Sequence, residues 1–312
     1  ALRLLKEFLK QKIDTNSFLF FGPDGVGKSY AARNFIKAIN CTGSNPAGID
    51  LPIPLKEGTN PEGIGHPDTF KDGTKEDSCD SCISCRRIDG NLSPDLLWLK
   101  PQTDEGSISI DSVRHIQYLM ALKPYEAGKR AFVLEDAHLL TGEAQDALLK
   151  VLEEPQDNSI FILITSKPHL LRQTVISRCQ RIRFSAIPDA IIEEILSNEF
   201  TLKRDDLTFV NNFSSGSLGD AKRLAGGDFF LNKNSILDTF IISPRKKISG
   251  DGLLELANEL KSFRKKEGPK ASAGGCGIEF KDVIRIFLSF FRDIIMFKIE
   301  QSEALINFDR TL

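Results

Sequence analysis

The first part of the chain repeats one pattern, in which short apolar runs alternate with longer segments whose apolar residues have helical spacing. The first apolar run predicts a buried strand at Phe18–Phe21, and further strands are predicted at Leu96–Lys100, Ala131–Glu135, Ile160–Thr165 and Gln180–Phe184. The segments between them predict amphipathic helices at Leu2–Ile13, Lys28–Asn40, Ile110–Leu122 and Gly142–Glu154. Strands that alternate with helices predict an α/β fold with a parallel sheet.

After Pro188 the spacing is helical only. Helices are predicted at Asp189–Asn198, Asp205–Asn212, Leu218–Ala225, in a block that begins near Asn232, and at Phe280–Glu300. The last of these is apolar around most of its circumference, so we expect it to be buried in its own domain or against neighbouring chains. Residues 42–78, rich in Gly, Pro, Asp and Thr, predict an irregular insertion, and Lys265–Gly277 predicts a flexible loop.

Composition and charge narrow the class of protein. The chain has 312 residues, of which 41% are hydrophobic, enough for two or three domains with ordinary cores. Its formal net charge of -2 gives no overall attraction to nucleic acid, so DNA contact would need a local patch or partner subunits. The most apolar segment, Val283–Ile299, contains Arg285, Arg292, Asp293 and Lys298, which argues against a membrane span. Because no segment resembles a signal peptide, we expect a cytoplasmic protein without membrane contact.

The turn after the first predicted strand carries a complete phosphate-binding motif. Its residues are Gly22, Pro23, Asp24, Gly25, Val26, Gly27, Lys28 and Ser29. The glycines allow backbone N–H groups to point at phosphate oxygens, and the following helix N-terminus adds positive potential. Lys28 would reach the terminal phosphates of ATP, and Ser29 would bind Mg²⁺. A glycine turn that matches by chance is the alternative, but the strand before it and the helix after it favour nucleotide binding.

A P-loop also needs an acidic residue at the end of a second strand. The run Ala131–Glu135 is followed by Asp136, so it ends in two carboxylates. We assign Glu135 to Mg²⁺ and Asp136 to the attacking water. Thr165, the last residue of another predicted strand, is added to the nucleotide-binding residues. A solvated acidic strand end is the alternative, and the P-loop upstream makes it less favoured.

Cysteines form the second chemical signal. Six are present, and without a secretion signal we expect thiols in a reducing compartment. The predicted ligands of a structural Zn²⁺ are Cys41, Cys79, Cys82 and Cys85. His66 as the fourth ligand and an iron–sulfur cluster are the alternatives. A structural zinc site needs no open coordination position, so we assign it no catalysis. Cys179 and Cys276 are isolated and are predicted not to be ligands.

Further motifs resemble one family. Residues 147–155, Ala-Leu-Leu-Lys-Val-Leu-Glu-Glu-Pro, are similar to the LLK-x-LEEP signature of bacterial clamp-loader ATPases of the AAA+ class. Residues 177–179, Ser-Arg-Cys, are similar to the SRC motif of that family, and the cysteine cluster lies where the family carries a zinc module. Residues 94–96 resemble the region of its HPD motif, with Ser93 in place of the histidine. The resemblance covers about residues 15–225.

The resemblance implies a fold, partners and a role. It implies an AAA+ P-loop domain at 1–186, with the zinc module and insertion at about 41–90. A three-helix lid at 187–230 and a C-terminal helical collar domain at 231–312 would follow. The implied function is ATP-dependent loading of the sliding clamp onto primed DNA, within a complex with gamma/tau and delta subunits. In such a ring the SRC arginine of one subunit reaches the γ-phosphate held by its neighbour, and Arg178 is the matching residue.

Departures from the family pattern indicate the type of subunit. Active members end the second strand with Asp then Glu, whereas Glu135 precedes Asp136 here. Gly219 stands where active gamma subunits carry a sensor arginine. Both departures favour a delta-prime subunit that donates Arg178 in trans and hydrolyses ATP poorly or not at all. The complete P-loop keeps a gamma/tau-type motor as the alternative. Outside the family, a P-loop kinase or a nucleotide-regulated zinc protein is the competing hypothesis.

Overall fold

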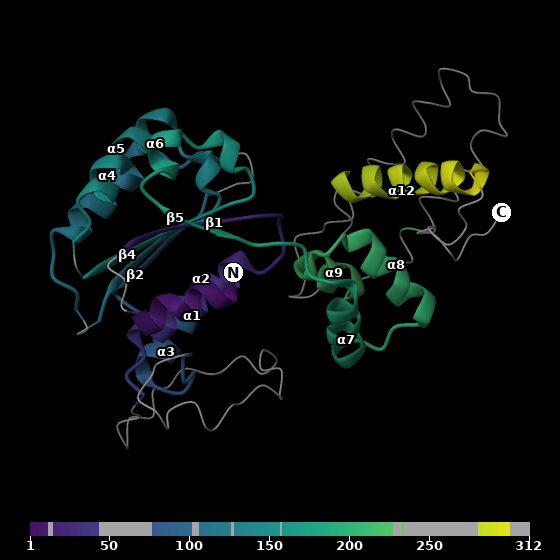
Figure 1. Ribbon diagram of the computed structural model, residues 1–312, viewed down its shortest axis with the longest axis horizontal. Helices are drawn as coiled ribbons and strands as arrows, with labels where there is room; N and C mark the ends of the chain where they lie inside the picture. Colours follow the sequence, from purple (N-terminus) through teal and green to yellow (C-terminus); the bar gives the residue numbers. More distant parts are fainter. Residues whose placement is uncertain are drawn as a thin grey trace, which may run out of the picture. The chain divides into compact units, whose positions relative to one another are not determined.

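The computed structural model describes residues 1–11, 15–43, 77–101, 106–125, 128–156, 158–226, 233 and 280–299 (Figure 1). The chain divides into two compact units, Ala1–Ser185 and Ala186–Leu312. Several predictions fall outside the described residues: most of the 42–78 insertion with His66, the helical block from Asn232, the loop Lys265–Gly277, and Cys276.

The first unit contains a five-stranded parallel sheet with the order β2-β3-β4-β1-β5. Its strands are β1 (Ser17–Phe21), β2 (Leu96–Leu99), β3 (Arg130–Leu134), β4 (Ser159–Thr165) and β5 (Gln180–Arg183). Each strand begins and ends within one residue of its predicted range, which confirms the expected α/β fold. The inner strands β3, β4 and β1 are nearly continuous apolar runs because helices cover both faces of a parallel sheet, whereas the edge strand β5 buries only Ile182.

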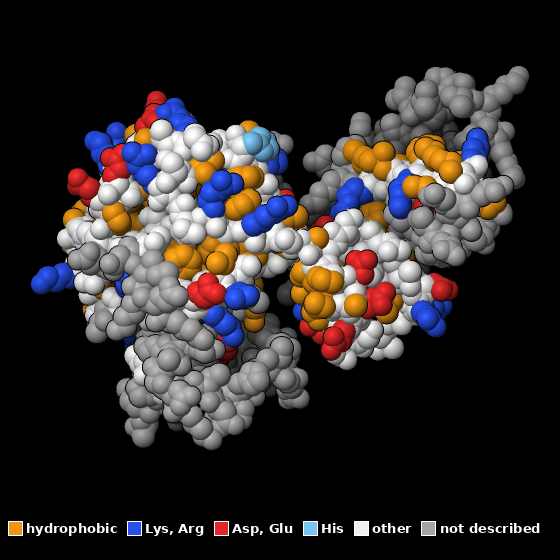
Figure 2. All heavy atoms as spheres, in the orientation of Figure 1, with side chains coloured by type: hydrophobic (Ala, Val, Ile, Leu, Met, Phe, Trp, Pro, Cys, Tyr) orange, Lys and Arg blue, Asp and Glu red, His pale blue; other side chains and the backbone are white. Residues whose placement is uncertain are grey.

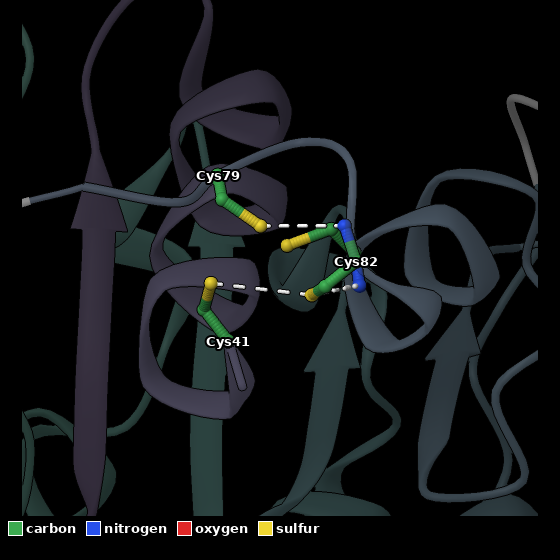
Figure 3. A group of neighbouring side chains, drawn as sticks. Cys41, Cys79 and Cys82 are labelled. Carbon is green, nitrogen blue, oxygen red and sulfur yellow. Dashed lines mark hydrogen bonds between the residues drawn. The ribbon is translucent and has the colours of Figure 1, made fainter. Parts of the chain in front are cut away.

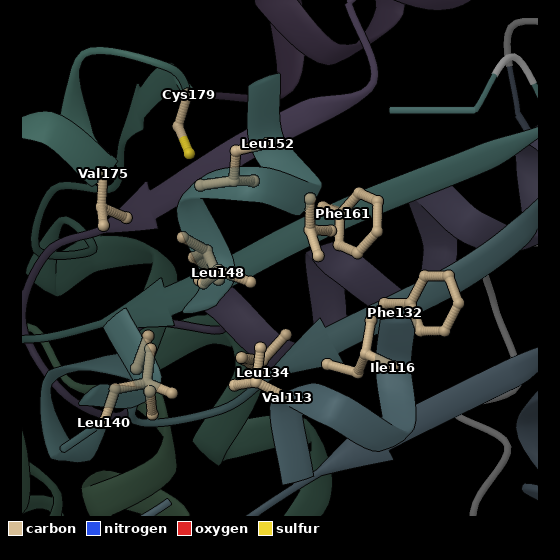
Figure 4. Packing of buried hydrophobic residues seen from close by; sticks show 14 of the residues in the cluster. Val113, Ile116, Phe132, Leu134, Leu140, Leu148, Leu152, Phe161, Val175 and Cys179 are labelled. Atoms are coloured by element: carbon tan, nitrogen blue, oxygen red, sulfur yellow. The ribbon is translucent and has the colours of Figure 1, made fainter. Parts of the chain in front are cut away.

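Each face of the sheet has its own helices and its own core (Figure 1). One face is covered by α4 (Ile110–Met120), α5 (Gly142–Glu153) and α6 (Gln173–Ile176), and the other by α1 (Leu2–Gln11), α2 (Lys28–Asn40) and α3 (Ile83–Asp89). In the first core, Phe132 and Phe161 stack with ring centroids 4.9 Å apart, beside Ile116 of α4 and Leu148 of α5 (Figure 4).

Short helices are the elements that the sequence pattern did not predict. These are α3 and α6, with the 3₁₀ turns η1 (Ala137–Leu139) and η2 (Pro168–Leu170). All of them are too short for an apolar period to emerge. Because the strands are parallel, the residues that follow β1, β3 and β4 meet at one edge of the sheet. That edge therefore brings together the P-loop, the carboxylates after β3 and Thr165.

The second unit is helical, as predicted. Its described helices are α7 (Asp189–Glu199), α8 (Arg204–Ser214), α9 (Leu218–Ala225) and α12 (Phe280–Lys298). They share one apolar core, to which α12 contributes Val283, Ile286 and Phe290. Fully buried Asp282 of α12 accepts hydrogen bonds of 2.7 and 2.9 Å from Arg223 of α9. The boundary between lid and collar near residue 230 stays a prediction.

The helix α12 buries one side in its own unit, while its other side is exposed in the single chain, so burial against neighbouring chains stays a prediction. Ile284, Leu288 and Ile295 are exposed in the described part of the chain, and Figure 2 shows hydrophobic side chains at the surface along this helix. None of the described helices combines the length and the apolar character needed to cross a membrane.

Candidate nucleotide site and cysteine cluster

The P-loop joins β1 to α2 and depends on glycine at two positions. Gly22 has φ 149°, and a Cβ there would lie 2.1 Å from the carbonyl oxygen of Phe184. Gly27 has φ 90° and caps the N-terminus of α2 in the left-handed conformation. Side chains at these positions would be strained, because L residues rarely adopt positive φ. The backbone of the turn therefore lies bare at the start of α2, as phosphate binding requires.

Lys28 lies inside this turn with only 7% of its surface exposed. Its Nζ donates hydrogen bonds to the carbonyl oxygens of Gly22 at 2.8 Å and Pro23 at 2.5 Å, and lies 3.6 Å from the Asp24 carboxylate. Burial lowers the pKa of Lys28, although Asp24 acts in the opposite direction. The ammonium group is thus held where a phosphate group could replace the carbonyl oxygens as its partner.

Glu135, directly after β3, meets the first residues of α2. Ser29 Oγ donates a 2.6 Å hydrogen bond to Glu135 Oε1. Trp98 Nε1 donates to Oε2 at 2.8 Å, and Lys100 Nζ pairs with the same oxygen at 2.8 Å. Burial acts to raise the pKa of Glu135, but the hydrogen bonds from Lys100, Ser29 and Trp98 outweigh it and lower that pKa. An ionised carboxylate beside a hydroxyl group offers the oxygen ligands that Mg²⁺ prefers.

Asp136 has a different environment from its neighbour. Its backbone is left-handed, with φ 50° and ψ 47°, a conformation that Asp tolerates better than most residues. Burial raises the pKa of Asp136, and the charges of Glu135 and Asp24 act in the same direction. The two adjacent carboxylates therefore have pKa values shifted in opposite directions, which is the arrangement expected of groups with different roles.

Thr165, at the end of β4, has a partner that the sequence did not indicate. Its Oγ1 lies 3.2 Å from His138 Nδ1 and accepts a 3.0 Å hydrogen bond from the backbone N–H of Lys167. Burial lowers the pKa of His138, which favours the neutral ring. The only sequence signal for His138 is its position two residues after Asp136. The edge of the sheet thus gathers every residue predicted for the nucleotide site.

The cysteine cluster is also assembled (Figure 3). The sulfur atoms of Cys41, Cys79, Cys82 and Cys85 all lie within 4.8 Å of one another. Tetrahedral zinc with Zn–S bonds of about 2.3 Å would separate its ligands by about 3.8 Å, and Cys41 Sγ lies 4.0 Å from Cys82 Sγ. The donor set therefore fits Zn²⁺, with Cys41 from the end of α2 as the fourth thiolate.

Hydrogen bonds within the cluster lower the pKa of Cys79 and Cys82, whereas burial raises the pKa of Cys41 and Cys85 in the metal-free chain. The backbone N–H groups of Cys82 and Cys85 point at the sulfur atoms of Cys79 and Cys82, at 3.3 and 3.5 Å. Burial acts to raise the pKa of Cys82, but hydrogen bonds from Cys85 and Thr42 lower it to about 6. Cys179 lies apart in the core, where burial raises its pKa to about 12, so it is an inert thiol.

Arg178 follows α6 and is bound to its own chain. Its Nη2 pairs with Glu153 Oε1 at 2.6 Å, and its Nη1 donates to the carbonyl oxygen of Thr174 at 2.9 Å. The side chain is 34% exposed. Gly219 is exposed on α9. In the single chain, the guanidinium group of Arg178 is thus paired with Glu153 and Thr174 of the same chain.

Comparison with known proteins tests the resemblance to clamp-loader ATPases. The family model described as DNA polymerase III, delta subunit, matches residues 68–188. The tau subunit of Bacillus subtilis DNA polymerase III is 27% identical over 252 residues, covering 77% of this chain and 39% of that protein. The Escherichia coli delta-prime subunit is 33% identical over 151 residues, covering 48% and 45%. The chain is similar to the tau and delta-prime subunits of DNA polymerase III.

The similarity extends to both kinds of subunit. The delta-prime subunit of Bacillus subtilis is 28% identical over 204 residues, which are 63% of this chain and 52% of that protein. The alignment with the tau subunit is longer, whereas the alignment with the Escherichia coli delta-prime subunit has the higher sequence identity. The chain spans about half or less of the length of these relatives.

Solved structures give weaker similarity. A gamma subunit-related protein of Thermotoga maritima superposes with a TM-score of 0.42 at 15% identity, over 92% of this chain and 76% of that one. The RuvB Holliday junction branch migration motor of Thermotoga maritima gives 0.42 at 16% identity, over 83% and 67%. Scores this low do not establish a shared fold, so the fold assignment rests on the parallel sheet.

Proposed function

We propose that this chain is a clamp-loader subunit of the bacterial replicative DNA polymerase that binds ATP with Mg²⁺. The observation that carries the proposal is the meeting of Lys28, Ser29 and Glu135 at the carboxyl edge of the parallel sheet. Sequence similarity to DNA polymerase III subunits gives the class of complex. Its partners would be gamma/tau and delta subunits, the sliding clamp, and primed DNA through the assembled complex, in the cytoplasm.

Each residue of the site then has a role. Lys28 binds the terminal phosphates, while Ser29 and Glu135 hold Mg²⁺, which neutralises charge on the phosphates. Asp136 would orient the attacking water, and Thr165, at the end of β4, would be a further nucleotide-binding residue. The four-cysteine cluster holds Zn²⁺ that stabilises the segment around α3 and takes no part in the reaction.

Among clamp-loader subunits we favour delta-prime. The order Glu135 then Asp136 puts the longer side chain on the magnesium side and the shorter one on the water side. An error of about 1 Å in the position of the water can cost on the order of 100-fold in rate. Gly219 provides no cation to couple α9 to the nucleotide. Hydrolysis by this chain is therefore expected to be slow even though its P-loop is complete.

The contribution of such a subunit would be Arg178. The guanidinium group is partly exposed and is held by Glu153 and Thr174 in the isolated chain. In an assembled ring, the γ-phosphate of a neighbour would compete with Glu153 for the same planar donor. An arginine supplied in trans makes hydrolysis depend on assembly, because the neighbour lacks the cation until the subunits meet.

A gamma/tau-type motor is the second candidate, and the long match to the Bacillus subtilis tau subunit favours it. The two candidates differ in ATP turnover by the chain alone. We expect calorimetry to show Mg²⁺-dependent ATP binding, with negligible phosphate release in the absence of partners. Sustained turnover by the chain alone would identify a motor subunit. Absence of both nucleotide binding and co-purification with gamma/tau and delta subunits would refute the clamp-loader assignment.

A further inference from the structure

One face of α2 connects the nucleotide site to the cysteine cluster. Ser29, Arg33 and Lys37 follow one another at intervals of four residues, so they lie on the same side of the helix. Ser29 is the residue that donates to Glu135. The other two residues contact the segment that carries the cysteines.

Arg33 and Lys37 hold α3 in place. Arg33 Nη1 donates to the carbonyl oxygens of Ile88 at 2.6 Å and Asp89 at 3.2 Å, at the C-terminal end of α3. The Ile88 carbonyl oxygen also accepts from the backbone N–H of Asn91 at 3.2 Å. The carbonyl groups at this end of the helix carry partial negative charge, so a guanidinium group there stabilises them. Buried Lys37 pairs with Asp89 at 3.1 Å and with Asp80, which lies between Cys79 and Cys82, at 2.7 Å.

Trp98 completes the connection. Its ring lies under the guanidinium carbon of Arg33, 4.8 Å from the ring centroid, and its Nε1 donates to Glu135 Oε2. The ring also packs against the core on the α2 side of the sheet. A continuous series of contacts therefore runs from α3 through Arg33 and Trp98 to the carboxylate that would hold Mg²⁺.

We propose that Trp98 is a positioning residue for Glu135, and that Arg33 makes this position depend on the cysteine cluster. The proposal rests on the proposed binding of Mg²⁺ and nucleotide. Trp98 and Lys100 hold Oε2 of Glu135 in place. The other oxygen, Oε1, accepts a hydrogen bond from Ser29 and could exchange that partner for a metal ion. Without the indole N–H, the carboxylate loses one of the two groups that fix its plane, and the magnesium position is less well formed.

The fluorescence of Trp98 can be used to test this proposal. Trp98 is the only tryptophan in the 312-residue chain, so intrinsic tryptophan fluorescence reports this residue alone. A change at Glu135 or at Arg33 alters the environment of the indole ring directly.

Calorimetry of the full chain with ATP, in Mg²⁺ or in EDTA, tests the positioning role. Trp98→Phe should weaken Mg²⁺-dependent ATP binding by about tenfold and change the Mg²⁺-free affinity by less than about twofold, whereas general damage would lower both equally. Tyr118→Phe, at an exposed ring on α4, is the control and should match the wild type. If the wild type binds no nucleotide, the proposed function fails as well. If it binds and Trp98→Phe keeps the full Mg²⁺ effect, only the positioning role is overturned.

Removal of zinc tests the connection to the cysteine cluster. A zinc chelator, added without Mg²⁺, should shift the Trp98 emission of the wild type. Arg33→Lys keeps the charge but loses the planar group that both stacks on the ring and reaches two carbonyl oxygens. Its emission should respond at most half as strongly, whereas Arg86→Lys, at an exposed arginine of α3, should respond like the wild type. An equal shift in all three proteins, or no shift in the wild type, would overturn the connection.

Discussion

The cysteine cluster and the nucleotide site use polar groups in opposite ways. The four thiols converge on one point, with their sulfur atoms within 4.8 Å of one another, so their geometry matches the coordination shell of one ion. At the nucleotide site, Lys28 contacts carbonyl oxygens of its own loop, and Glu135 contacts Ser29, Trp98 and Lys100. A structural metal site is complete within one chain, whereas a binding site keeps its groups occupied with partners that a ligand can replace.

Arg178 follows the second pattern. Its contacts with Glu153 and Thr174 satisfy the guanidinium group within its own chain, at a position that is partly exposed. Under the proposed role in trans, Arg178 would need such a temporary partner, because an unpaired cation at a partly buried position is costly. The comparison therefore separates groups with permanent partners from groups whose partners are exchanged.

The cysteine cluster should give the largest effect on stability. We expect metal analysis to find about one zinc ion per chain. Cys82→Ser should lower the zinc content and destabilise the segment around α3 by several kcal/mol, because the free energy of binding structural zinc contributes directly to folding. Cys179→Ser is the matched control, since it changes a buried thiol outside the cluster and should keep the zinc. Full zinc in Cys82→Ser, or iron in the wild type, would contradict the assignment.

The P-loop should give the next largest effect, this time on affinity. Lys28→Ala removes a charge-assisted phosphate contact that typically contributes about 1.5–3 kcal/mol, or about 10- to 150-fold in the dissociation constant. Lys6→Ala, at an exposed lysine of α1, controls for the loss of a positive charge. Equal ATP affinity of both variants in calorimetry would show that Lys28 keeps its loop carbonyl partners when nucleotide binds.

The two neighbouring carboxylates should give small stability effects of opposite sign, each on the order of 1 kcal/mol. The pKa of Glu135 is lowered by its hydrogen bonds, which outweigh burial, so its charge stabilises the fold above the ordinary value of 4.5. This contribution is lost as the pH falls through the lowered pKa. Glu135→Gln should therefore lower Tm at pH 7, and its difference from the wild type should shrink in acid.

Ionisation of Asp136 should have the opposite effect on the stability of the fold. Because burial raises its pKa, its ionisation destabilises the fold as the pH rises above the ordinary value of 3.8. Asp136→Asn keeps a side chain that tolerates the left-handed backbone, so it should raise Tm at pH 7 and match the wild type in acid. Thermal unfolding of both variants at pH 7 and in acid checks these two predictions. Changes of Tm in the same direction for Glu135→Gln and Asp136→Asn at pH 7 would contradict the opposite environments of the two carboxylates.

Local signals predicted much of the fold and of the site. Strands β1, β3 and β4 are compact apolar runs, and the P-loop and the cysteine triplet are contiguous motifs, so their positions follow from short segments. The meeting of Ser29 with Glu135 also follows, because parallel strands end at one edge. The fourth ligand, Cys41, could be chosen because it was the available thiol at the end of a predicted helix.

The contacts that join these parts could not be predicted. Trp98 contacts Glu135 because the edge strand β2 pairs with β3, and Arg33 contacts α3 because that short helix packs on α2. Neither packing leaves a trace in local periodicity, and α3 itself has too few residues to show one. Glu153 belongs to a recognisable motif, but its partner Arg178 is set by how α6 turns back onto α5.

The most direct test of the central claim is ATP hydrolysis by a complex assembled from this chain with gamma/tau and delta subunits, with wild-type Arg178 or Arg178→Ala. The account predicts that the variant chain binds nucleotide like the wild type and assembles normally. Clamp- and DNA-stimulated hydrolysis should fall at the one site facing this subunit, by about a thousandfold at that site, and Arg178→Lys should rescue it poorly. Unchanged hydrolysis and clamp loading by a fully assembled Arg178→Ala complex would contradict the claim.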